Sequence, residues 1–166
     1  GDILDFAALE AGRMTAEQVP FHLPSLLEEV RATFAGRAIE KGITLALRSA
    51  GDEPEYLEGD PAHLRRILGN VLANAVRFTE RGGVALFCRR LGPAKHNGAL
   101  LEFRVQDTGI GIARERLQKI FQPFSRAGTA SSPQPGRGGL GLAICRGLLD
   151  LMGGEISIES IPDGGT

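Results

Sequence analysis

Apolar residues recur with a helical period in three long segments of the chain. In residues 24–42 they return every three or four positions up to a closing glycine. Residues 61–79 repeat this spacing behind Asp60, a residue type that favours the N-cap of a helix. Residues 140–154 form a third such segment, again closed by glycine. The pattern therefore predicts three helices, each with one buried face.

Two shorter segments also favour helix. Residues 2–12 are mostly apolar and stop at Gly12, as the last turns of a helix and its cap do. Residues 113–121 read "ARERLQKIF" and predict a short helix. The segment that follows, residues 125–139, is rich in Gly, Ser and Pro, and we expect a mobile loop there.

Other segments alternate with the period of a β-strand. In residues 99–106 apolar side chains point one way and polar ones the other, which predicts a half-buried strand that ends at Asp107. Residues 19–23 predict a short extended piece. Three further strands are expected at residues 43–50, 82–90 and 155–161.

Composition restricts the class of protein. The chain has 166 residues, a length that suits one compact domain with a short appendage. Its net charge of −1 gives no electrostatic reason to bind nucleic acid or an anionic membrane. No apolar run approaches the ~20 residues of a membrane span, and no signal-peptide pattern begins the chain, so we expect a soluble, cytoplasmic protein. Cys88 and Cys145 lack metal-ligand spacing and are interpreted as reduced, packed thiols.

Two asparagines interrupt the apolar helix predicted at residues 61–79. Asn70, Asn74 and Arg77 project from one side of it, at the border of the apolar stripe. Asparagine is a poor helix former, so the pair needs an explanation. One interpretation is two partly buried amides bonded to neighbouring backbone; the other is a pair of oxygen ligands near a cation or phosphate, with Arg77 offsetting negative charge.

The segment "DTGIGI", residues 107–112, allows three interpretations. It can be a simple turn after a strand. An Asp-Thr-Gly triplet also occurs in aspartic proteases, but these need a second aspartate of the same kind, and no second triplet exists here. In the third interpretation Asp107 is a fixed hydrogen-bond acceptor, and Gly109 and Gly111 let a flat ligand approach the backbone.

The segment "GRGGLG" matches the pattern G-x-G-x-x-G at Gly136, Gly138 and Gly141. A dinucleotide fold requires a buried strand directly before this pattern, and "ASSPQP" cannot form one. What remains is either a flexible linker before a helix or a glycine-rich loop whose helix N-terminus can bind phosphate. The histidines form no triad or shared motif and are interpreted as structural or exposed: His22, His63 and His96.

Read in order, four motifs resemble those of the ATP-binding catalytic domain of bacterial sensor histidine kinases, especially the hybrid type. They are "NVLANAVRFT" (N box), "DTGIGI" (G1 box), "FQPF" (F box) and "GRGGLGLAI" (G2 box). The larger family includes DNA gyrase, the Hsp90 chaperones and MutL. The resemblance covers nearly the whole chain: residues 1–13 resemble the tail of the dimerisation helix that carries the phosphoacceptor, and residues 14–166 the catalytic domain. It implies an α+β fold, a two-layer α/β sandwich of the Bergerat type, with a mixed, mostly antiparallel sheet packed on three helices.

The resemblance also implies ATP and Mg²⁺ as cofactors. Asn74, assisted by Asn70, would ligate Mg²⁺, and Arg77 would face the phosphates; these three are the catalytic residues implied. Gly139 and Gly141 would wrap the phosphates by their backbone N–H groups. The full implied nucleotide site comprises Asn70, Asn74, Arg77, Phe78, Asp107, Gly109, Gly111, Ile112, Phe121, Phe124, Gly138, Gly139, Leu140, Gly141 and Leu142.

On the base side, the resemblance implies that Asp107 accepts a hydrogen bond from the adenine amino group. Gly109 and Gly111 would let the base lie close to the backbone. Residues 113–138 would form a lid over the nucleotide. Two aromatic residues would anchor it: Phe121 and Phe124.

The implied activity is transfer of the γ-phosphoryl group of ATP to a histidine on a dimerisation domain that this chain lacks. The implied partners are that domain, a response-regulator receiver domain and a second copy in a full-length homodimer. Two departures from the family pattern, Arg77 in place of Lys and Gly138 in place of Ser or Thr, leave open a degenerate nucleotide-binding regulatory module. A serine/threonine kinase of the anti-sigma type is a further alternative, which the dimerisation-helix tail disfavours.

Overall fold

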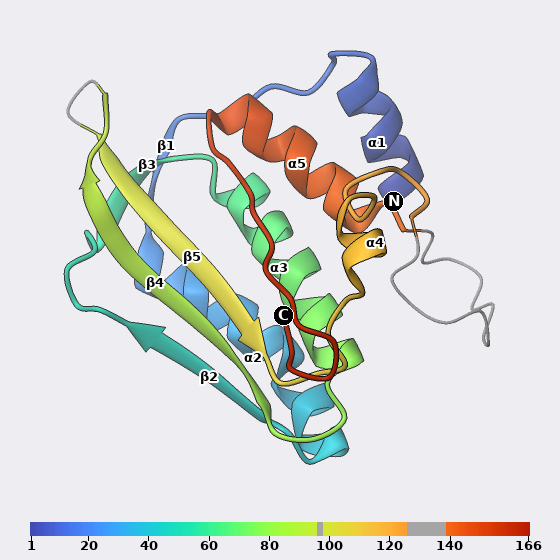
Figure 1. The fold of residues 1–166 in the computed structure, drawn as a ribbon. Helices are drawn as coiled ribbons and strands as arrows, with labels where there is room; N and C mark the ends of the chain where they lie inside the picture. The colour runs from blue at the N-terminus through green and yellow to red at the C-terminus, as the bar shows by residue number, and fades with distance from the viewer. Residues whose placement is uncertain (96–97, 126–138) are drawn as a thin grey trace.

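The computed structural model describes residues 1–95, 98–125 and 139–166 and shows an α+β arrangement (Figure 1). The helices are α1 (Asp2–Glu10), α2 (Leu23–Lys41), α3 (Pro61–Phe78), α4 (Arg114–Leu117) and α5 (Gly141–Met152). The strands are β1 (Val19–His22), β2 (Thr44–Ser49), β3 (Tyr56–Gly59), β4 (Gly83–Pro93) and β5 (Ala99–Asp107). The three long helices and the strands β2, β4 and β5 are those that the apolar periodicity predicts.

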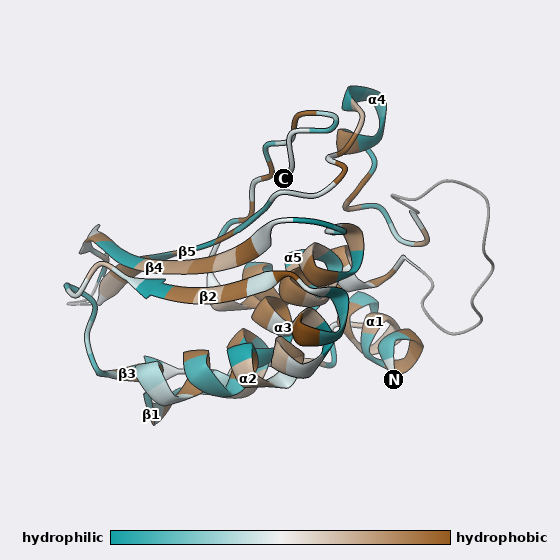
Figure 2. Cartoon of the chain, turned by 90° about the horizontal axis from the view of Figure 1, so that it is seen from below, coloured by the Kyte–Doolittle hydropathy of each residue, from teal (hydrophilic) through white to brown (hydrophobic). Residues whose placement is uncertain are grey.

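The strands form two sheets. In the larger one β4 lies in the middle, parallel to β2 and antiparallel to β5. The smaller sheet pairs β1 with β3 in antiparallel register. Because the larger sheet contains both kinds of pair, it is mixed, as expected. Helices α2 and α3 lie on one side of this sheet (Figure 2).

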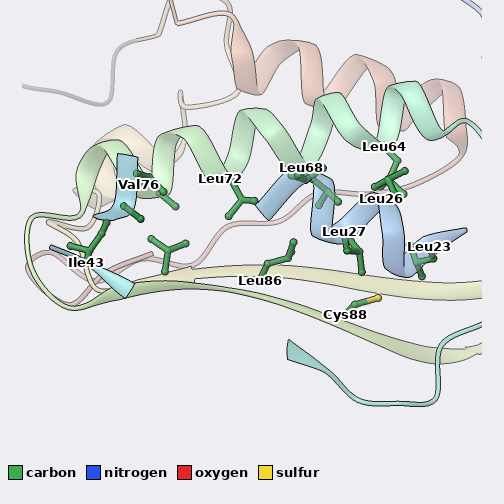
Figure 3. Packing of buried hydrophobic residues seen from close by; sticks show 14 residues of the cluster. Leu23, Leu26, Leu27, Ile43, Leu64, Leu68, Leu72, Val76, Leu86 and Cys88 are labelled. Atoms are coloured by element: carbon green, nitrogen blue, oxygen red, sulfur yellow. The ribbon is translucent and has the colours of Figure 1, made fainter. Parts of the chain in front are cut away.

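The main core lies between that sheet and helices α2 and α3. Alternate residues of β4 are buried, among them Leu86 and Cys88, and they face α3 and α2 (Figure 3). From α3, Leu68 and Leu72 point toward the sheet (Figure 3). The period of 2 in the strand and of 3.6 in the helix thus bury one face of each element against the other.

A second apolar cluster joins α3, α5 and α1. Its buried members are Ile67, Leu140, Ile144, Cys145 and Leu148, with Phe6 and Leu9 of α1 packed against them. Arg66 of α3 forms ion pairs with Asp2 at 3.1 Å and with Asp5 at 2.5 Å. Figure 1 shows α1 and α5 side by side. This cluster positions the N-terminus of α5 relative to α3.

The helix ends follow local sequence signals. Asp60, as predicted, caps α3 by accepting from the His63 N–H at 2.8 Å, and its second oxygen accepts from the Glu17 N–H at 2.9 Å. Gly42 closes α2 in the left-handed conformation with φ of 66°. Asp60 therefore joins the segment after α1 to the start of α3.

Two predictions differ from the structure, and one strand pairing was not predicted. Residues 155–161 form no ladder with the described residues, because a strand needs a neighbour for its backbone groups and within these ranges the segment makes a single bridge, between Ile161 and Gly165. The helix predicted at residues 113–121 stops at Leu117, since the following hydrogen bonds are i→i−3 and Pro123 cannot donate one. Strand β3 and its pairing with β1 were not predicted. The predicted mobile loop lies almost entirely outside the described residues.

Candidate functional site

Helix α3 presents Asn70, Asn74 and Arg77, as its sequence predicts. Asn70 is half-buried, and its Nδ2 atom donates to the Gly141 carbonyl at 3.2 Å. Asn74 is also half-buried and makes no hydrogen bond within the described ranges. Arg77 is exposed and places its guanidinium 4.7 Å from the centre of the Phe78 ring. One hydrogen bond thus brings together two motifs that lie 71 positions apart.

The N-terminus of α5 carries no capping side chain. Leu140, buried at the N-cap position, supplies only its carbonyl, which accepts from the Ile144 N–H at 2.9 Å. The N–H groups of Gly141, Leu142 and Ala143 bond to none of the described residues. Such a helix end holds free donors and the positive pole of the helix dipole, so it favours an anion.

Asp107 ends β5 and is held by the residues around it. Its Oδ1 atom accepts from the Gly109 N–H at 2.9 Å and from the Thr166 N–H at 3.2 Å. Its own N–H donates to the Thr166 carbonyl at 2.8 Å. The Oδ2 atom has no hydrogen bond to the described part of the chain. The side chain is therefore oriented by one oxygen and offers the other as an acceptor.

The glycines after Asp107 pack against the chain's own backbone. A Cβ atom at Gly109 would lie 2.5 Å from the Phe78 carbonyl oxygen. At Gly111, where φ is 69°, a Cβ atom would collide with the Ile161 carbonyl. These contacts explain why both positions need glycine, and close approach of a ligand base to them stays a prediction.

The Asp107 segment is joined to the end of α3. The Ile110 N–H donates to the Phe78 carbonyl at 3.4 Å. Thr108 Oγ1 accepts from the Gly83 N–H at 3.0 Å and donates to the Arg81 carbonyl at 2.8 Å. Sequence reasoning missed these links, because nothing in the pattern marks a threonine that bonds to backbone 25 and 27 positions away.

The C-terminal segment supports the same loop from its other side. Ser160 Oγ accepts from the Ile112 N–H at 2.7 Å and donates to the Gly165 carbonyl at 2.9 Å. Gly165 packs so closely on the Asp107 carbonyl that a Cβ atom there would collide with it. The strand-end aspartate is therefore surrounded by backbone from three parts of the chain.

The predicted lid lies partly outside the described residues, as do Gly136 and Gly138. On its N-terminal side Phe121 is half-buried and its ring centre lies 5.3 Å from the Arg146 guanidinium of α5. Phe124 is 65% exposed and has a positive φ of 61°. Gly139 has a φ of 66°, and its Cα hydrogen faces the Ser125 carbonyl region so closely that a Cβ atom would collide. Ser125 and Gly139, the described residues on either side of residues 126–138, are therefore in contact.

The cysteines are free and buried, as predicted. Burial raises the pKa of Cys88 to about 12. Burial also raises the pKa of Cys145 to about 11, against a smaller lowering by the nearby Asn70 amide. Both thiols are thus protonated at neutral pH and neither is a reactive thiolate.

The histidines stand apart from this site. His22 Nδ1 accepts from the Ser25 N–H at 3.3 Å and caps α2. His63 Nδ1 lies 2.9 Å from Asp60 Oδ2 at the start of α3. His96 lies outside the described residues. Within the described ranges, no group of three or more His, Cys, Asp and Glu is placed to hold a metal, and no helix is long and apolar enough to cross a bilayer.

Comparison with known proteins gives consistent matches. Residues 59–166 match the family described as "Histidine kinase-, DNA gyrase B-, and HSP90-like ATPase". Over 99% of this chain, the sequence is 39% identical to the sensor protein GacS of Pseudomonas syringae pv. syringae and 38% identical to the signal transduction histidine-protein kinase BarA of Escherichia coli K12. The chain spans 18% of the length of each of these relatives.

A solved structure shares the fold. The crystal structure of full-length ShkA in complex with AMPPNP superposes with a TM-score of 0.82 and 35% sequence identity. The match covers 99% of this chain and 32% of that one. It extends through α1 and the segment after it, which lie outside the family match.

Proposed function

This chain belongs to the histidine kinase-, DNA gyrase B- and HSP90-like ATPase family, and from this premise we propose that it is the catalytic domain of a two-component sensor histidine kinase. Membership confirms the resemblance of the four motifs and the α+β fold that it implies. The domain would bind Mg·ATP and transfer its γ-phosphoryl group to a histidine on a dimerisation domain. The observation that carries the proposal is the Asn70–Gly141 hydrogen bond, which joins the two motifs expected at the phosphates.

The described residues fit Mg·ATP in their donor chemistry. Asn70 Nδ2 is engaged by the Gly141 carbonyl, whereas among the described residues neither Asn70 Oδ1 nor the Asn74 carboxamide has a hydrogen-bond partner, so both can serve as ligands. Amide oxygens are ligands that Mg²⁺ accepts. The uncapped N-terminus of α5 next to Asn70 suits phosphate oxygens. Bound Mg²⁺ would neutralise charge on the phosphates during transfer.

In this proposal the site residues divide into those that bind the metal and phosphates and those that bind the base. Asn74 and Asn70 orient the metal and phosphates, and Arg77 adds positive charge. The N–H groups at Gly141 and Leu142 hold phosphate oxygens. Asp107 Oδ2 accepts from the amino group of adenine, while Phe78, Ile112 and the glycines around them form the walls of the base pocket. Phosphoryl transfer needs mainly positioning and charge neutralisation, which these groups supply.

The partners and the location belong to the proposal as well. The chain would act on a dimerisation domain of the same protein, within a homodimer, and a receiver domain would take the phosphoryl group onward. The relatives named above are several times longer than this chain, which leaves room for such domains, including the hybrid arrangement. The catalytic domain would lie in the cytoplasm, where ATP is available.

A transfer assay tests the function. The chain is mixed with a histidine-bearing dimerisation domain from the same full-length protein and with ATP labelled on its γ-phosphate. We expect label on the acceptor in an acid-labile, alkali-stable form, as a phosphohistidine gives, and none when the acceptor histidine is replaced by alanine. Failure to bind ATP at all would overturn the proposal.

One observation favours a second candidate, a nucleotide-binding regulatory module without turnover. The Arg77 guanidinium lies over the Phe78 ring, and its planar fork differs in shape from the compact ammonium of the lysine that is usual in the family. In the transfer assay this candidate gives ATP binding without label on the acceptor. Arg77→Lys would then restore transfer if the guanidinium is the cause.

A further inference from the structure

Lys41, the last residue of α2, reaches across to the end of α3. Its Nζ atom donates to the Val76 carbonyl at 2.8 Å and to the Arg77 carbonyl at 3.0 Å. It also lies 3.4 Å from a carboxylate oxygen of Glu80. The Lys41 side chain is 22% exposed and Glu80 is 77% exposed, so the carbonyl bonds are the more protected part of this arrangement.

These bonds complete an unusual helix end. The last carbonyls of a helix have no partner inside the helix, and here each one finds a partner outside it. Thr79 Oγ1 donates to the Ala75 carbonyl at 2.8 Å. Lys41 donates to the carbonyls of Val76 and Arg77. The Ile110 N–H donates to the Phe78 carbonyl at 3.4 Å. The end of α3 is thereby held at four successive carbonyls.

The held turn carries the residues assigned to the phosphates. Asn74 and Arg77 lie within the last turns of α3, so the direction of their side chains depends on the backbone that Lys41 fixes. A helix C-terminus also carries the negative pole of the helix dipole, which repels phosphate. The Lys41 ammonium lies directly on those carbonyls and offsets this charge.

We infer that Lys41 is a positioning residue for the triphosphate: it fixes the last turn of α3 so that Asn74 and Arg77 face the phosphates, and it offsets the helix pole there. The inference rests on the proposed function. It goes beyond the motif residues because Lys41 lies in α2, outside residues 59–166 that match the family, and its Nζ atom bonds to backbone carbonyls.

The base side has its own supports. Asp107 is oriented by the N–H groups of Gly109 and Thr166, and Thr108 is bonded to the start of β4. None of these bonds involves Lys41. Loss of the lysine is therefore expected to weaken contacts to the phosphates much more than contacts to the adenine.

The test compares Lys41→Met with matched variants by calorimetry. Methionine keeps the apolar stem and removes the charge and the donors. We expect affinity for Mg·ATP to fall about tenfold and affinity for adenosine to change less than about twofold. Lys41→Arg keeps charge and donors and is expected to stay within about threefold of the unchanged chain. Lys95→Met, at an exposed position in the β4–β5 hairpin, is the control and should change neither.

Glu80→Gln separates the two kinds of contact that Lys41 makes. It removes the exposed ion pair and leaves the carbonyl bonds, so we expect unchanged Mg·ATP affinity. A loss as large as that of Lys41→Met would overturn the inference, and so would equal losses of ATP and adenosine affinity, since these would indicate general loosening. If Lys41→Met binds Mg·ATP as tightly as the chain without substitutions, the inference about Lys41 is refuted and the proposed function is not. If the chain without substitutions does not bind ATP, the proposed function itself is refuted.

Discussion

The Asn70 side chain donates from Nδ2 to the Gly141 carbonyl at 3.2 Å, and this single bond joins the middle of α3 to the first residue of α5. A Cβ atom at Gly141 would lie 3.6 Å from the Asn70 Cγ atom, in ordinary contact. The two helices thus meet where one offers amide oxygens and the other offers N–H groups that have no partner among the described residues.

Asn74→Ala is expected to remove Mg²⁺-dependent ATP binding and leave the fold intact. Asn74 makes no hydrogen bond within the described residues, and alanine is the better helix former, so the free energy of unfolding should change by less than about 1 kcal/mol. Affinity for Mg·ATP should fall about 100-fold or more. Calorimetry in Mg²⁺ and in EDTA measures the ATP affinity with and without the metal. Undiminished affinity in Mg²⁺ would remove the metal assignment.

Asp107→Asn is expected to weaken adenine nucleotides selectively. The asparagine can keep a carbonyl oxygen at the Oδ1 position, where two N–H groups donate, and then places an NH₂ group where Oδ2 stood. A donor there faces the donating amino group of adenine, so ATP affinity should fall about 10- to 100-fold. Inorganic triphosphate, measured by competition, should be unaffected. Equal losses for both ligands would mean that Asp107 does not contact the base.

Gly111→Ala is expected to destabilise the domain by about 1–3 kcal/mol, because the positive φ and the Ile161 carbonyl both oppose a side chain. Gly36→Ala is the matched control. Gly36 lies exposed inside α2 with nothing within 4 Å of a Cβ atom, so alanine there should stabilise by about 0.5–1 kcal/mol. Urea unfolding measures both. A neutral effect at Gly111 would contradict the close backbone contact.

Asp60→Ala is expected to lower stability by about 1–2 kcal/mol at neutral pH through loss of the α3 cap. Burial raises the pKa of Asp60, but the N–H groups of Glu17 and His63 and the charge of His63 outweigh it, and the pKa is lowered overall. A lowered pKa in the folded state means that the stabilisation is full above the unfolded-state value, near pH 4, and is lost as pH falls below it.

The pH dependence supplies the control for this variant. Because the stabilisation by Asp60 requires the carboxylate, the difference in unfolding free energy between the unchanged chain and Asp60→Ala should shrink as the pH is lowered from about 5 to below 3. Denaturation by urea at each pH measures it. A difference that stays constant over this range would show that the charged form of Asp60 does not stabilise the fold.

Local signals in the sequence determined most of the elements, and the family resemblance supplied the candidate site residues. Helices α2, α3 and α5 follow from apolar periodicity and from caps such as Asp60, and strands β2, β4 and β5 from alternation. Asn70 and Asn74 were singled out because asparagine is a poor helix former, and Asp107 because glycines follow it at the end of a strand. Such signals act between neighbours in the chain, so they can be read without a fold.

Tertiary structure alone decided how these elements meet. The alternation in residues 155–161 predicts a strand, yet no neighbour in the described part of the chain completes a ladder there. Lys41 looks like an ordinary surface lysine in the sequence, but it bonds to carbonyls 35 and 36 positions away. Gly109 and Gly111 fit a turn in the sequence, whereas the structure shows backbone pressed against them. Contacts of this kind depend on which surfaces packing brings together, which no local pattern contains.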